Sequence, residues 1–61
     1  MKVKIELLYE NDKDRPNRAE AVEVRDGLTG LRLLNAIERV VQKQFETDYD
    51  WTRWILVSIV N

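Results

Sequence analysis

Side chains that act as nucleophiles or as soft metal ligands are almost missing from this chain. It has no cysteine and no histidine, so disulfides and the usual nitrogen- and sulfur-ligated zinc site are excluded. The single serine, Ser58, falls in an apolar run and has no imidazole to activate its hydroxyl. The two glycines, Gly27 and Gly30, do not make a phosphate-binding loop. We therefore expect neither enzymatic activity nor a cofactor.

The most polar segment, ENDKDRPNR at 10–18, contains the side chains best suited to hold a small ligand. The guanidinium groups of Arg15 and Arg18 could bind an anion in a forked geometry. Asp12 and Asp14 alternate as at the start of a calcium loop, but the glycine and the closing glutamate of that motif are missing. We favour a solvated loop. The alternative is a small-ligand or nucleic-acid site at these two arginines, extended by the basic residues Arg32, Arg39 and Lys43 of the predicted helix.

Aromatic residues near the C-terminal end are the strongest candidates for contacts with another protein. Tryptophan is enriched at the centres of protein interfaces, and the chain has Trp51 and Trp54. An odd spacing places these two side chains on opposite faces of a strand. We expect Trp51 to close the core near the end of the helix and Trp54 to contact a partner. Tyr49 lies between two aspartates and is a further candidate contact.

Charge and composition narrow the classes of partner. Ten basic and eleven acidic residues give a net charge of −1, which argues against a protein that binds duplex DNA. Nucleic acid is therefore not the favoured partner. The longest apolar run, at 54–57, is far shorter than the about 20 residues of a membrane span. The N-terminal sequence MKVKIELLYE alternates polar and apolar residues, unlike a signal peptide, and we expect a cytoplasmic protein.

The chain is short for a domain that is stable alone. Hydrophobic residues make up 44% and charged residues 34% of its 61 residues, a globular rather than a disordered balance. In so small a domain, apolar burial only about offsets the lost conformational entropy. Because disulfides and zinc are excluded, association with another chain is the remaining common source of stability.

The elements follow from apolar periodicity. Strict alternation predicts a strand at 2–9, with Val3, Ile5, Leu7 and Tyr9 on one face. A less regular segment at 19–26 predicts a second strand. Thr29 is the expected N-cap of a helix that begins at Leu31 and ends near Glu46, and 51–60 reads as the last strand. The apolar arc of the helix comprises Leu33, Leu34, Ile37, Val40, Val41 and Phe45.

The predicted fold class is α+β, in the order strand, strand, helix, strand. Residues 1–61 form a single small domain without repeats or linkers. A hairpin followed by a crossover favours a three-stranded, mostly antiparallel sheet in the order 2-1-3, with the helix packed on one face. A central position for the last strand is the alternative, because the long first loop need not close a tight hairpin.

The last strand is apolar on both faces, and one helix can cover only one face. We expect its inward residues to be Ile55, Val57 and Ile59, packed against the helix. The outward, partner-binding residues are then Trp54, Leu56 and Val60, with Leu8 nearby. Exposed apolar patches of this kind mark association surfaces. Self-association into a homodimer is the commonest way to bury them, and docking on a foreign protein is the other.

Size and style, rather than a motif, give the only resemblance to known proteins. The chain is similar in these respects to small accessory proteins of phages and mobile elements, which commonly act by occluding a host protein such as a defence complex. We therefore expect a non-catalytic protein–protein interaction module, homodimeric and acting as an inhibitor of a host protein.

Overall fold

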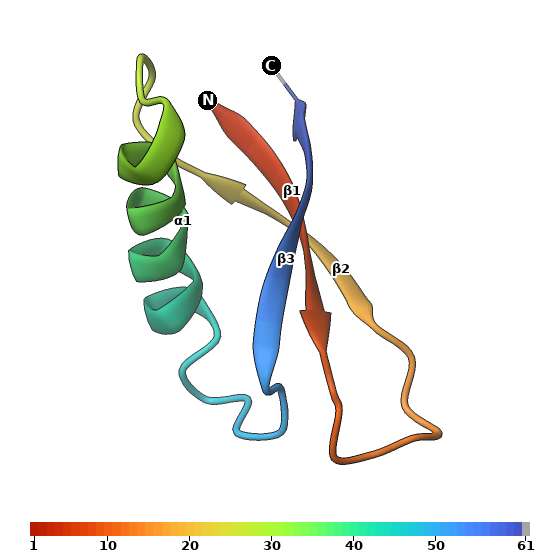
Figure 1. Ribbon diagram of the computed structural model, residues 1–61. Helices are drawn as coiled ribbons and strands as arrows, with labels where there is room; N and C mark the ends of the chain where they lie inside the picture. Colours follow the sequence, from red (N-terminus) through yellow and green to blue (C-terminus); the bar gives the residue numbers. More distant parts are fainter. Residues whose placement is uncertain (61) are drawn as a thin grey trace.

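A computed structural model describes residues 1–60 as one antiparallel sheet with a helix on one of its faces (Figure 1). Strand β1 spans Lys2–Leu8, β2 spans Arg18–Glu23, helix α1 spans Gly30–Gln44 and β3 spans Arg53–Val60. The sheet order is β2-β1-β3, and β1 pairs antiparallel with both neighbours. The predicted α+β class, element order and strand order are therefore confirmed.

Strand β1 is the centre of the fold, and its strict alternation explains why. Val3, Ile5 and Leu7 are completely buried, while Lys2 and Lys4, which alternate with them, are exposed on the opposite face. Tyr9, just past the end of the strand, is also buried. An apolar set of period two fits a strand with one face against a helix, as the sequence predicts.

Strand β2 begins one residue before the predicted segment at 19–26 and ends three residues before that segment ends. Val22 pairs with Val3 and is buried with it. The alanine-containing segment at 19–21 is extended, since it is paired with residues 4–6 of β1. Pairing with a neighbouring strand thus overrides the helical preference of alanine.

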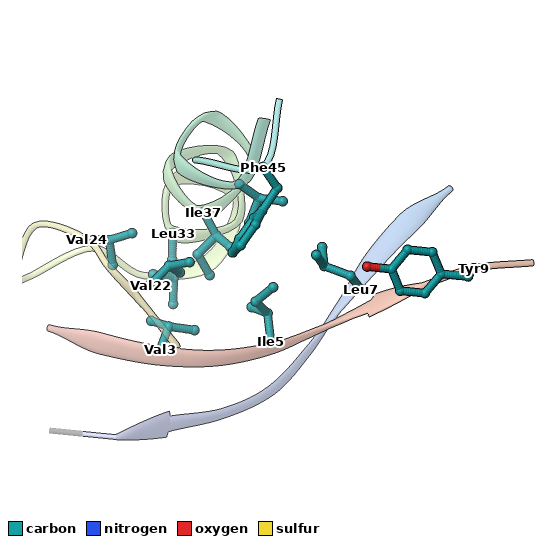
Figure 2. Close-up of a cluster of buried hydrophobic side chains, with 10 residues drawn as sticks. Val3, Ile5, Leu7, Tyr9, Val22, Val24, Leu33, Ile37 and Phe45 are labelled. Atoms are coloured by element: carbon teal, nitrogen blue, oxygen red, sulfur yellow. The ribbon is translucent and has the colours of Figure 1, made fainter. Parts of the chain in front are cut away.

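Helix α1 lies over β1 and β2, and its buried stripe follows the predicted period. Leu33, Ile37 and Val41 are buried, and Figure 2 shows Leu33, Ile37 and Phe45 between the helix and Val3 and Ile5 of β1. Thr29 is the N-cap as predicted, but its side chain makes no capping hydrogen bond. Leu34, placed in the same arc by the sequence, is 40% exposed. The buried core comprises Val3, Ile5, Leu7, Tyr9, Val22, Val24, Leu33, Ile37, Val41 and Phe45.

Strand β3 contains an irregularity that the sequence does not reveal. Lys4 pairs with Ser58, whereas the next residue, Ile5, pairs with Leu56. Val57 is therefore the extra residue of a β-bulge, opposite no residue of β1. A bulge shifts the alternation of side chains by one position, so the two halves of β3 do not share one period.

The bulge corrects the predicted faces of β3. Residues directly opposite one another in antiparallel strands lie on the same face. Leu7, Ile5 and Val3 face the helix and pair with Trp54, Leu56 and Ile59. The predicted outward placement of Trp54 and Leu56 is wrong, and so is the predicted inward placement of Ile55, which is paired with Glu6 on the open face. Val60 and Leu8 lie on the open face as predicted, paired with Lys2 and Arg53.

Candidate functional site

Strand β3 is an edge strand whose apolar residues remain exposed on both faces. It bonds only to β1, so its other edge presents unpaired backbone N–H and C=O groups to solvent. Its five aliphatic side chains are 39% to 48% exposed. We call this set the β3 surface, and it consists of Ile55, Leu56, Val57, Ile59 and Val60.

The helix leaves β3 uncovered because its buried stripe packs over β1 and β2. On the flank of α1 nearest β3, Leu31, Leu34 and Glu38 recur at the spacing that places residues on one side of a helix. Leu31 is 76% exposed. The helix-facing side of β3 and this flank of α1 therefore both present apolar side chains to solvent.

Trp54 bridges the helix and β3. It is half-buried against the core, and its indole Nε1–H donates a hydrogen bond to the Glu38 carboxylate. This bond, and then a second one from the Gln42 amide, lower the pKa of Glu38 below its usual value. The arrangement gives Trp54 a structural task on the helix side of the sheet. Its role in partner binding stays a prediction.

Trp51 has the structural role that the sequence predicts. It is half-buried against the core, and its Nε1–H donates to the backbone carbonyl of Phe45 at 3.1 Å. The bond holds the chain where it turns from the helix toward β3. Trp51 thus has a structural role and is not part of the β3 surface.

On the open face of the sheet, the predicted contact residues Leu8 and Val60 lie at opposite ends of the β1–β3 pair. Leu8 is half-buried, and its carbonyl accepts a hydrogen bond from the backbone N–H of Thr52 at 2.7 Å. Val60 is 44% exposed. Ile55, paired with Glu6, lies between them, so the apolar residues of this face comprise Leu8 of β1 with Ile55 and Val60 of β3.

Tyr49, the remaining predicted contact residue, is separated from the β3 surface. It belongs to the connection between α1 and β3 and is 89% exposed. With Asn11, Asp12, Arg15 and Asp50 it lines a pocket of about 240 Å³. This pocket is polar, and its residues belong to the two long connections, after β1 and after α1. These two connections lie at the same end of the molecule (Figure 1).

Arg15, in the loop after β1, and Arg18, at the start of β2, are paired with carboxylates of the chain itself. Arg15 lies 3.0 Å from Asp50, measured from Nη1 to Oδ2. Arg18 reaches Glu20 at 2.6 Å and Asp48 at 3.3 Å. The hydrogen bond to Glu20 raises the pKa of Arg18. An external anion would have to compete with these partners, which weighs against the ligand site placed on this loop.

Tyr9 is the buried centre of this polar cluster. Its hydroxyl donates a hydrogen bond to Asp48 at 2.7 Å, and the guanidinium of Arg15 lies 3.6 Å from the centre of its ring. The hydrogen bond from Tyr9 is the main reason that the pKa of Asp48 lies below its usual value. Burial, and then Asp48, raise the pKa of Tyr9. The cluster fastens the connection after the helix to the loop after β1.

A second surface lies on the flank of α1 opposite β3. A groove of about 860 Å³ runs between the helix and the connection that follows β2. Three arginines line it: Arg25, Arg32 and Arg39. Sequence reasoning recognised the two helical arginines only as part of a basic face and missed the groove, because Arg25 joins them only through the fold. The apolar lining comprises Val24, Leu28, Ala36 and Val40.

Other kinds of site find no support in the described part of the chain. Within residues 1–60, no group of three or more carboxylate, histidine or cysteine side chains could hold a metal ion. No helix in that range is long and apolar enough to cross a membrane.

No protein-family model, no curated protein and no solved structure matches the chain.

Proposed function

We propose that this protein is a non-catalytic protein–protein interaction module that self-associates through β3. The unpaired edges of β3 in two copies pair antiparallel, about a two-fold axis, and join the two sheets into one. Closed two-fold symmetry is the commonest form of self-association.

The observation that carries the proposal is a strand with the composition of a central strand in an edge position. Runs that are apolar on both faces are typical of strands buried on both sides. In β3 the run from Ile55 to Val60 is interrupted only by Ser58, and yet its apolar residues are 39% to 48% exposed. Pairing with a second β3 would make this strand central and cover part of that surface.

The contrast between the two edges of the sheet supports β3 as the associating edge. Edge strands in monomers are usually protected by charged residues, prolines or bulges. Strand β2 is protected in this way by Arg18, Glu20 and Glu23. Residues 55–60 of β3 contain no charge and no proline, and the bulge at Val57 is their only irregularity. An apolar edge whose only protection is one bulge is an aggregation hazard unless a specific partner covers it.

The size of the domain supports the same proposal. A chain of 61 residues without cysteine or histidine lacks the disulfides and zinc that stabilise many domains this small. Partner binding stabilises the folded state by mass action. Self-association would supply that stabilisation.

A lysine placed in the middle of the edge tests the proposal. Size-exclusion chromatography with light scattering should give wild-type protein twice the 7.3 kDa mass of the chain. Val57→Lys should weaken association by about a hundredfold, because pairing would bury two like charges. Val57 is 45% exposed, so far-UV circular dichroism should show that the variant still folds.

The matched control is Tyr49→Lys, which adds the same charge at an exposed residue away from β3. It should dimerise like the wild type. A wild type that remains monomeric at millimolar concentration would refute the proposal. Equal weakening by both lysines would show that association depends on net charge rather than on β3.

A further inference from the structure

The groove between α1 and the connection after β2 has the chemistry of a binding site for acidic peptides. We propose that it binds a short, extended segment of a partner protein in which acidic and aliphatic residues alternate. The site is on the opposite flank of the helix from β3, so this inference does not depend on self-association.

The charges of the groove favour an anionic ligand. Within residues 1–60, the ion pairs involve other basic groups, and none includes Arg25, Arg32 or Arg39. The one carboxylate that lines the groove, Glu23, lies 3.2 Å from the N-terminal ammonium group. The groove thus carries three unpaired positive charges, whereas the arginines of the first loop are already paired.

The shape of the groove favours an extended peptide. A hollow of about 430 Å³, which shares Arg39 and Val40 with the groove, continues it to Lys43. Arg32 and Lys43 are eleven positions apart, which is about 16 Å along a helix. An extended chain covers that length with about five residues at about 3.3 Å each. Carboxylates on such a segment would reach successive basic side chains.

The lining between the arginines favours a peptide over nucleic acid. Its apolar residues, such as Leu28 and Val40, are aliphatic and suit a leucine or valine side chain. Proteins that bind single-stranded nucleic acid usually supply aromatic side chains on which bases stack, and no aromatic residue lines this groove.

Fluorescence anisotropy with a labelled peptide tests the site. The probe is an eight-residue peptide in which glutamate and leucine alternate, measured at about 50 mM salt so that screening is weak. Wild-type protein should bind it, and Arg32→Gln/Arg39→Gln should reduce the affinity about tenfold through the loss of two charge-assisted contacts. Both arginines are exposed, so the double variant should fold normally.

Matched controls separate this site from general charge effects and from the β3 surface. Lys4→Gln/Arg53→Gln removes the same charge from the open face of the sheet and should change the affinity less than about twofold. Val57→Lys should bind the peptide like the wild type, whether or not it dimerises.

Three results would overturn the proposal. One is failure of wild-type protein to bind the glutamate peptide. Another is equal affinity for a peptide with glutamine in place of glutamate. The third is tighter, Arg32- and Arg39-dependent binding of a thymidine oligonucleotide, which would make the groove a nucleic-acid site.

Discussion

At the residue scale, Tyr9 joins two distant parts of the chain. Its ring is buried at the end of β1, and its hydroxyl reaches Asp48, which is 39 positions away. The alternation of β1 predicts the burial of Tyr9. The partner of its hydroxyl is not predictable in the same way, because it depends on where the chain passes after the helix. Trp51 could be placed from sequence, since a large aromatic beside the end of a helix has few other places to pack.

The hydrogen bond from Tyr9 to Asp48 should be measurable as stability. Tyr9→Phe removes the hydroxyl and keeps the ring, so the free energy of unfolding should fall by about 1 kcal/mol. Urea denaturation at pH 7 measures the change. Tyr49→Phe, which alters an exposed tyrosine, is the control and should leave stability unchanged.

The difference in stability between wild type and Tyr9→Phe should depend on pH in a defined way. The hydrogen bond keeps the pKa of Asp48 low in the folded state, so the stabilisation is complete above the ordinary aspartate pKa and is lost as pH falls through the folded value. The difference between wild type and Tyr9→Phe should therefore narrow below about pH 4. A difference that stays constant down to pH 2 would contradict this role of Asp48.

At the scale of elements, β3 shows where sequence reasoning succeeds and fails. Its β-branched and aromatic composition predicts a strand, and its lack of polar positions predicts exposure of apolar residues. The bulge at Val57 has no local signal such as a glycine. A strict period of two therefore assigned Trp54 and Leu56 to the wrong face. The prediction that apolar residues are exposed on both faces of β3 did not depend on which face was assigned to which residues.

The link between α1 and β3 can be tested through Glu38. Glu38→Ala removes the acceptor of the Trp54 indole and should lower the free energy of unfolding by about 0.5 to 1 kcal/mol, because the contact is partly exposed. Trp54 fluorescence should change with it. Glu38→Gln retains an acceptor oxygen and should restore most of the stability. If alanine and glutamine variants were both as stable as the wild type, the contact would not hold the helix to β3.

For the whole molecule, the sheet order could be predicted because few connections are possible. One hairpin and one crossover leave β1 in the centre. The position of the helix across the sheet could not be predicted, since apolar periodicity defines its buried stripe but not the strands beneath it. The position of the helix determines both proposed surfaces. Because α1 covers β1 and β2, it leaves β3 open on one flank and forms the arginine-lined groove on the other.

Hydrogen exchange of the β3 backbone tests self-association through this edge most directly. In an antiparallel edge strand, alternate amides bond to the neighbouring strand and the others face solvent. We predict that the solvent-facing amides of residues 53–60 are protected at high protein concentration and lose protection on dilution, while those bonded to β1 stay protected. Rapid exchange of the solvent-facing amides at every concentration would contradict pairing of two β3 strands.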